Sequence, residues 1–182
     1  MPISINGSGT VTGVSVGGLP DGIVDTDMLA AGAVTAAKKG AGSVLQVKYA
    51  KMGSSDFSYA SGTETDITGL SIDITKSSAS NKILVMCAIT PYVGGSGGTG
   101  HYRLKCLRDS TTIHNNNFVF FRETDTHKSA GPVMLLLDDG ANDTSSHTYK
   151  MRVQGVDAGR QWYIFTNSGA NINGLMCMEI AA

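Results

Sequence analysis

The sequence lacks a charge imbalance, a long apolar run and, before Tyr49, any aromatic residue. Its 182 residues include 14 Lys and Arg and 15 Asp and Glu, for a formal net charge of −1. This balance removes the electrostatic basis for binding nucleic acid or an anionic membrane. No apolar stretch approaches the ~18 residues of a transmembrane helix, and no basic segment followed by an apolar one suggests a signal peptide. We therefore expect no nucleic-acid partner and no membrane insertion.

Cysteine is also scarce. The three residues, Cys87, Cys106 and Cys177, each lie inside an apolar run that is typical of a strand. An odd number without close spacing favours free thiols over a disulfide framework. We expect buried free thiols and synthesis in a reducing compartment.

The composition changes near residue 45. Residues 1–43 are mostly Gly, Ala, Ser, Thr, Val and Asp, which are too small to build a core of their own. Alternation over residues 3–19 predicts short extended pieces that pair with a neighbour. Residues 26–32 and 35–40 have the capping pattern of single helical turns, which are too short to persist alone. The sequence therefore predicts an anchoring arm over residues 1–43 and a folded domain over residues 44–182.

The arm would become ordered by packing against other chains. Three arms together could pair their backbones and bury small apolar side chains at an axis, where glycine permits close approach. This reasoning predicts a homotrimer. The residues that we expect to be buried there are Val14, Val16, Leu19, Ile23, Met28 and Leu29.

From Val44 onward, evenly spaced apolar runs predict strands separated by turns rich in Gly, Asn, Ser and Asp. The run over 83–90 is apolar at both parities, which is typical of a central strand. The absence of a long helical pattern favours an all-β fold, an antiparallel β-sandwich of jelly-roll type. The expected strands are 44–52, 67–74, 83–90, 102–106, 118–122, 133–137, 147–153, 162–166 and 175–180.

Several segments resemble a bacteriophage virion domain. They are 66–75 (DITGLSIDIT), 80–85 (SNKILV), 103–111 (RLKCLRDST) and 175–180 (LMCMEI), preceded by arm segments 21–29 and 42–47. These segments resemble the jelly-roll-like C-terminal knobs of tail fibres, spikes and head fibres, which are common in marine and cyanobacterial phages. The resemblance implies a virion protein made in the cytoplasm of a bacterial host, a homotrimer with its arms bundled at one end. The chain is short for a tail fibre and has no long shaft, which leaves a tail, baseplate or capsid location open.

Motifs for catalysis or cofactors are weak. Residues 95–100 match G-x-G-x-x-G, but a dinucleotide site needs a helix next, and here a strand is predicted from Tyr102. The four histidines lack metal-ligand spacing. The acidic segment 138–143 lacks the carboxylate ladder of a calcium loop and is expected to be a solvated turn. We expect no enzyme activity, no cofactor and no metal.

We expect binding residues on loops, because loops positioned by a rigid scaffold often carry the binding residues of a protein. Trp162 is expected in the core, since it lies in an apolar strand, and His147 in the core or an interface. The loops over 94–101 and 122–131, remote from the arm, are the candidates for a host receptor, a surface glycan or protein. Their candidate residues are Gly95, Gly97, His101, Glu123, Asp125 and His127.

The leading hypothesis is thus a short tail fibre or spike, anchored by its arm to other virion proteins. A capsid decoration, cement or head-fibre protein is the alternative within virions. A soluble carbohydrate-binding module is the alternative of another class.

Overall fold

A computed structural model shows the fold. It describes residues 4–5, 11–12, 33–35, 38–53, 55–93, 98–122, 133–158, 161–164 and 173–182. The chain divides into two compact units, Met1–Lys39 and Gly40–Ala182. Among the described residues, no helix has the length and apolar character of a membrane span.

In the first unit, two short strands pair with each other. Strand β1 (Ser4–Ile5) is antiparallel to β2 (Val11–Thr12), with Ile5 opposite Val11. These two pieces thus pair with each other within the chain, and their pairing with a neighbouring chain stays a prediction. Only five residues separate the two strands, so this local pairing costs little loop-closure entropy. Near residue 38 the amide of Lys38 donates to the Thr35 carbonyl at 2.9 Å, a single turn at the predicted place. The other predicted helical turn, over 26–32, lies outside the described residues.

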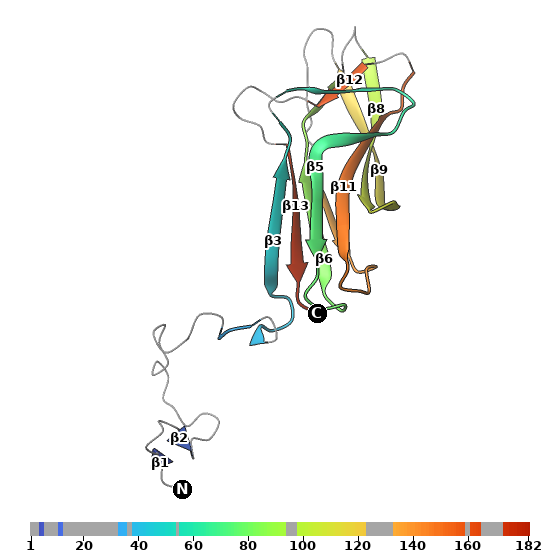
Figure 1. Cartoon of the computed structure of the whole chain (residues 1–182). Coiled ribbons are helices and arrows are strands. Elements are labelled where there is room, and N and C mark those ends of the chain that lie inside the picture. Colours follow the sequence, from blue (N-terminus) through green and yellow to red (C-terminus); the bar gives the residue numbers. More distant parts are fainter. Residues whose placement is uncertain are drawn as a thin grey trace. The chain divides into compact units, whose positions relative to one another are not determined.

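The second unit contains two four-stranded antiparallel sheets (Figure 1). The first sheet, here sheet I, has the spatial order β10 (Val133–Asp138), β6 (Lys82–Ala88), β13 (Gly174–Ile180) and β3 (Val44–Lys51). The second, sheet II, has the order β5 (Thr65–Thr75), β11 (Ser146–Gly155), β8 (Gly98–Arg108) and β9 (Thr111–Arg122). Two Greek keys that share both sheets produce this order, so the predicted jelly-roll sandwich is confirmed by the topology.

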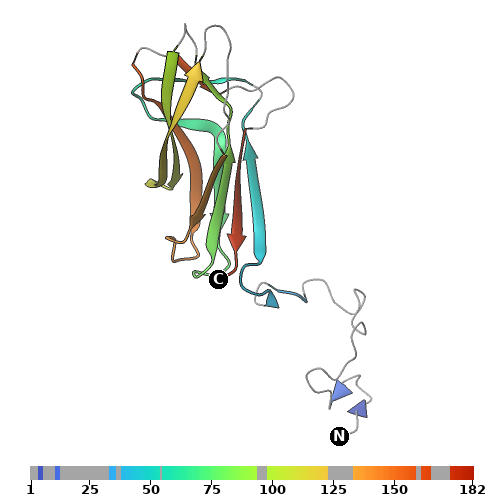
Figure 2. The ribbon, with the colours of Figure 1, turned by 180° about the vertical axis from the view of Figure 1, so that it is seen from behind.

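The strand directions give the sandwich two different ends. At one end, the turn end, lie residues 76–81, 109–110 and 139–145, the start of β3 and the C-terminus (Figure 1). There the Gly42 amide donates to the Ala181 carbonyl at 2.8 Å. At the other end, the loop end, lies a small sheet of order β4 (Phe57–Ala60), β12 (Gln161–Ile164) and β7 (Pro91–Val93), seen from behind in Figure 2. Of these three strands, the sequence predicted only β12.

The core lies between the sheets and continues under the loop end. Alternate residues of each long strand point inward, as in Tyr149, Met151 and Val153 of β11, which are fully buried. His147, expected in the core or an interface, is half-buried at the turn end, outside the core, and its place in an interface stays a prediction. All three cysteines are free and buried, as predicted, and burial raises the pKa of Cys87 and of Cys177 to about 12.

Aromatic rings close the core at the loop end. Trp162 is fully buried, as predicted, and its ring centre lies 6.2 Å from that of Tyr59 and 5.8 Å from that of Tyr102. Gly155 and Gly100 lie directly against this ring. A Cβ atom at either position would lie less than 3.0 Å from an indole atom, so the absence of a side chain at both makes room for Trp162.

Candidate assembly surface

The outward face of sheet I, here called the apolar face, carries most of the exposed large hydrophobic side chains among the described residues. On β13 the residues Leu175 and Cys177 point into the core, and the alternate residues Met176 and Met178 point outward. In most half-buried antiparallel strands the outward set is polar, because it meets water. Here both sets are apolar.

The strand register joins these outward residues into continuous rows. One row runs across the sheet from β10 to β3 through Leu135, Met86, Met176 and Tyr49. The next row toward the turn end runs in the same order through Leu137, Leu84, Met178 and Val47. Neither row contains a charged side chain. The nearest outward lysines, Lys51 and Lys82, lie in the rows beyond them, so charge is confined to the rim of the face.

The apolar face is exposed at both edges. Six of its side chains are between 46 and 67 % exposed, namely Val44, Val47, Tyr49, Val133, Leu135 and Leu137. Together they present on the order of 500 Å² of apolar surface. This area is near the upper end of the size range of the largest apolar patch on a typical monomer. Only two other large hydrophobic residues are comparably exposed in the described part of the chain, Val34 and Val156. Exposed apolar surface is therefore concentrated on this one sheet.

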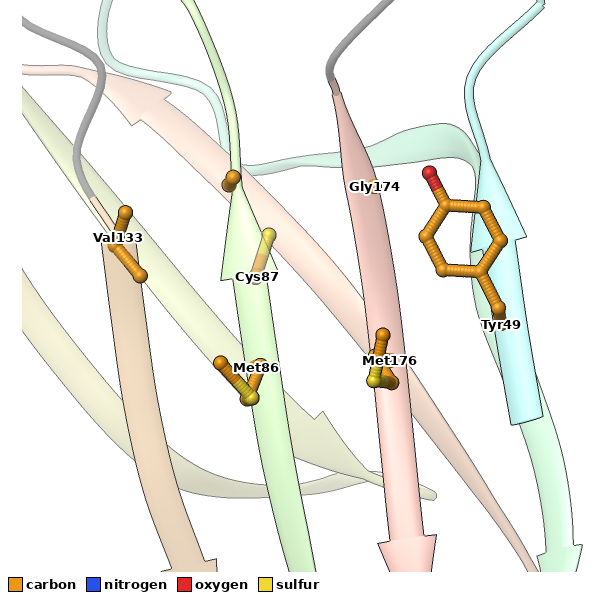
Figure 3. A pocket seen from close by; sticks show the side chains of 7 residues that line it. Tyr49, Met86, Cys87, Val133, Gly174 and Met176 are labelled. Carbon is orange, nitrogen blue, oxygen red and sulfur yellow. The ribbon is translucent and has the colours of Figure 1, made fainter. Parts of the chain in front are cut away.

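A shallow hollow of about 170 Å³ lies in the apolar face near the loop end (Figure 3). Its lining comes from all four strands and consists of Tyr49, Met86, Cys87, Ala88, Val133, Gly174 and Met176. The Tyr49 ring lies over Gly174, and a Cβ atom at position 174 would meet that ring at less than 3.0 Å. Glycine thus lets the tyrosine lie flat on the sheet, which shapes one wall of the hollow.

The outward face of sheet II carries charged side chains, in contrast to the apolar face of sheet I. Lys150 donates to Asp66 at 2.8 Å, and Arg152 donates to the same carboxylate at 2.5 Å. Lys105 pairs with Glu64 beside them. These exposed ion pairs add little stability, but they keep this face hydrated. The described part of this face is therefore suited to water, unlike the apolar face.

Buried polar groups fix the turn end. The Glu179 carboxylate accepts hydrogen bonds from the Ser77 amide, Asn81 Nδ2 and Gln46 Nε2, each at 2.6 Å. Burial alone would raise the pKa of Glu179, but these hydrogen bonds outweigh burial and hold the pKa below its usual value. The buried Lys76 ammonium donates to the carbonyls of Ala79, Asn81 and Ala141. These bonds fix the turn after β5 against β3 and β13, near the point where the chain enters sheet I.

A second buried group overturns part of an expectation. The segment 138–143 was expected to be a solvated turn, but Asp138 is buried. Its carboxylate accepts hydrogen bonds from Arg108 and from the Tyr149 hydroxyl, each at 2.6 Å. Burial would raise the pKa of Asp138, but these bonds and the Gly140 amide lower it. The rest of the segment is solvent-exposed apart from Ala141.

His147 connects two turns at the same end. Its Nδ1 lies 2.7 Å from Asp109 Oδ2, and its Nε2 lies 3.0 Å from Asp143 Oδ1. Both ring nitrogens carry a proton only in the imidazolium form, so this geometry favours the charged ring. The hydrogen bond to Asp109, followed by that to Asp143, raises the pKa of His147 above 6.5 despite partial burial.

This clamp predicts a pH-dependent stability. A raised folded-state pKa means that the contribution of His147 is complete below about pH 6.5 and is lost as the pH rises through the folded-state value. The difference in unfolding free energy between the unaltered chain and His147→Gln should therefore be largest near pH 5.5 and should be smaller at pH 9, where the charge-dependent part is lost. Chemical denaturation across this range measures it. Thr144→Gln, in the same turn, is the control and should show no such trend; an equal difference at both pH values would contradict the clamp.

Most of the sequence-predicted binding residues lie outside the described residues. This applies to the arm residues Val14, Val16, Leu19, Ile23, Met28 and Leu29 and to the loop residues Gly95, Gly97, Glu123, Asp125 and His127. His101 is described. Its Nδ1 lies 3.1 Å from Asp157 Oδ1, and its amide donates to the same carboxylate. The strands that flank segments 94–97 and 123–132 all end at the loop end, opposite the start of β3.

The described residues contain no group of three or more His, Cys, Asp or Glu side chains that could hold a metal ion. The glycine-rich segment 94–97 is followed by strand β8, not by the helix that a dinucleotide site requires.

The apolar face was not predicted from the sequence. The signal was present in β10, where Val133 through Leu137 form an unbroken apolar run, and in β13, where methionine occupies the outward positions. An apolar run at both parities, such as that over 83–90, predicts a strand buried on both sides. It equally fits a strand with one face in the core and the other free to meet a partner.

Comparisons with known proteins give fold similarity only. No family model matches the chain, and no curated protein matches its sequence. Similar solved structures include the infectious bursal disease virus Gt strain, with 12 % identity, TM-score 0.46, and coverage of 75 % of this chain and 38 % of that one. The VP2 subviral particle of the same virus has 13 % identity, TM-score 0.47, and coverage of 75 % and 32 %. Latent PorU from Porphyromonas gingivalis has 6 % identity, TM-score 0.42, and coverage of 75 % and 13 %.

The chain thus spans well under half the length of each of these proteins. At such identities and scores the likeness carries no argument about function. What is established is the fold: an antiparallel jelly-roll sandwich, assigned from its own strand order.

Proposed function

We propose that the chain is a structural protein of a bacteriophage virion, a short tail fibre or spike that acts as a homotrimer. Residues 1–43 anchor it to other virion proteins, and the loop end of the sandwich contacts the host surface. The proposal includes no catalytic role and no cofactor.

The observation that carries this proposal is the apolar face. A free-standing sandwich would place two polar faces in water, but this one exposes rows of Leu, Val, Met and Tyr on sheet I. Exposed apolar surface of this kind marks a site of protein association. A protein built to join an assembly has a reason to carry it, and a solitary binding module does not.

The strand directions support different roles for the two ends of the sandwich, attachment at the turn end and host contact at the loop end. Strand β3 begins at the turn end, so any segment that precedes residue 40 enters the sandwich there. Strands β3, β6, β9 and β11 all run toward the opposite end of the sandwich and end there (Figures 1 and 2). Attachment through the arm would therefore leave this end far from the point of attachment, where loops that contact a host would have to lie.

Deletion of residues 1–43 tests the anchoring role. The remaining domain has its own core, so its thermal unfolding should stay cooperative, with a midpoint within a few degrees of that of the full chain. It should no longer attach to particles that lack the protein, as measured by co-sedimentation. Full-length protein with Ser71→Glu, a change on the charged face, is the control and should attach normally. Undiminished attachment of the deleted form would contradict anchoring by the arm.

Imaging of labelled protein on purified particles separates the remaining alternatives. Label at a tail or baseplate supports the fibre or spike. Label distributed over the capsid would identify a decoration or head-fibre protein instead. Glycan binding by the free protein, with no particle association, would favour a carbohydrate-binding module.

A further inference from the structure

We propose that the apolar face is covered by further copies of this chain, with the β10 edge of one copy packed on the β3 side of the next. Three copies would then close a ring around an axis parallel to the strands. This inference rests on the proposed homotrimer and assigns its contact to sheet I.

The charge pattern permits close contact between copies. A charged side chain inside such a contact would have to be paired with an opposite charge or would be buried unpaired at a cost. The two central rows of the apolar face contain no charge, so copies can meet there without repulsion. The described outward charges of sheet II are instead paired within the chain, as in Lys150 with Asp66.

The amount of surface fits a protein partner. The six most exposed side chains, together with the half-buried Leu84, Met86, Met176, Met178 and Ile180, offer on the order of 700 Å², close to the ~800 Å² that one partner buries in a standard interface. In a ring this area is divided between two neighbours, about 350 Å² for each, so a single contact is smaller than a standard interface and the three contacts stabilise the ring together. A short peptide could not cover four strands at once.

The two edges of the face differ in shape, as a ring requires. A closed ring needs two different surfaces on each copy, because each copy contacts one neighbour with one surface and the other neighbour with the second. The β10 edge is a ridge of Val133, Leu135 and Leu137. The β3 side has the exposed Tyr49 ring lying over Gly174 beside the hollow. An axis parallel to the strands brings equal rows of neighbouring copies to the same height, so that Leu137 of one copy faces Val47 of the next.

Engineered cysteines at Leu137 and Val47 test this arrangement. Within one chain these residues end the same row and are separated by three strand spacings, about 14 Å. A disulfide needs Cα atoms within about 7 Å, so any bond between these two positions must join two copies. The natural cysteines are buried and remain outside the reaction. Full-length Leu137→Cys/Val47→Cys protein is oxidised with diamide, beside the two single variants, and resolved by non-reducing electrophoresis.

A covalent trimer from the double variant, with no cross-link in either single variant, is the expected result. Covalent dimers from a single variant would show a two-fold contact and overturn the ring. No product from the double variant would overturn the assignment of the contact to this face. Particle co-sedimentation of the unoxidised double variant separates the two proposals: attachment without cross-linking refutes only this inference, and a cross-linked trimer that fails to attach refutes only the virion role.

Discussion

Leu135→Glu should convert the assembled protein into a folded monomer. Leu135 lies at the centre of the β10 ridge, and its side chain is 62 % exposed in the single chain, so glutamate there meets water and the fold tolerates it. In the assembly the same carboxylate would be buried without a cation. An uncompensated buried charge costs about 3–5 kcal/mol, which weakens each contact by at least ~100-fold.

Two controls keep this prediction specific to the apolar face. Ser71→Glu adds the same charge to the outward face of sheet II, beside Lys150, and should leave the assembly intact. Monomeric Leu135→Glu should keep the strand content of the unaltered chain, measured by far-UV circular dichroism, and should still unfold cooperatively, which shows that the loss is in assembly and not in folding. Light scattering gives the mass of each variant. A Leu135→Glu protein of unchanged mass would show that this ridge is outside the contact between copies.

Trp162→Ala should have the largest effect on the fold itself, a loss of about 3–5 kcal/mol in unfolding free energy. The indole is fully buried and stacks at 6.2 Å against Tyr59, whose ring lies 6.1 Å from that of Phe57. Gly100 and Gly155 lie against the indole and have no side chains. Neither residue can therefore fill the space that the removed indole leaves. The cavity therefore remains largely open, and the small sheet at the loop end loses its support.

Urea denaturation measures this loss, with Tyr163→Ala as the matched control. Tyr163 is the next residue of β12 and is only half-buried, so its truncation should cost clearly less. A Trp162→Ala loss below about 1 kcal/mol, or one equal to that of Tyr163→Ala, would contradict the role of Trp162 as the central contact of the loop end.

Most long strands were predictable because alternation is a direct consequence of strand geometry. Segments such as 147–153 alternate between core and solvent, and the structure places β11 there. Strand β8 was predicted over 102–106 but spans Gly98–Arg108. The prediction began too late because the glycine and threonine residues at the start of β8 provide no apolar signal. Strands β4 and β7 are only 4 and 3 residues long, and their pairing with β12 depends on tertiary packing.

The assembly surface was less predictable than the strands that form it. Sequence reasoning placed the contacts between copies in the arm and the host contacts in two loops, largely outside the described residues. The apolar face depends on which strands are neighbours, since Leu135, Met86, Met176 and Tyr49 come from four separate segments. The buried contact of Asp138 with Arg108, 30 residues away, is likewise a product of the topology. No local pattern signals such pairs.

The mass of the unaltered full-length chain in solution tests the central claim most directly. Light scattering at micromolar concentration should give three times the 19.0 kDa of one chain. Exposure of the apolar face to water is unfavourable in free energy, and contact with further copies removes the face from water. A stable mass of 19.0 kDa across that concentration range would mean that sheet I needs no second copy, and it would contradict the account.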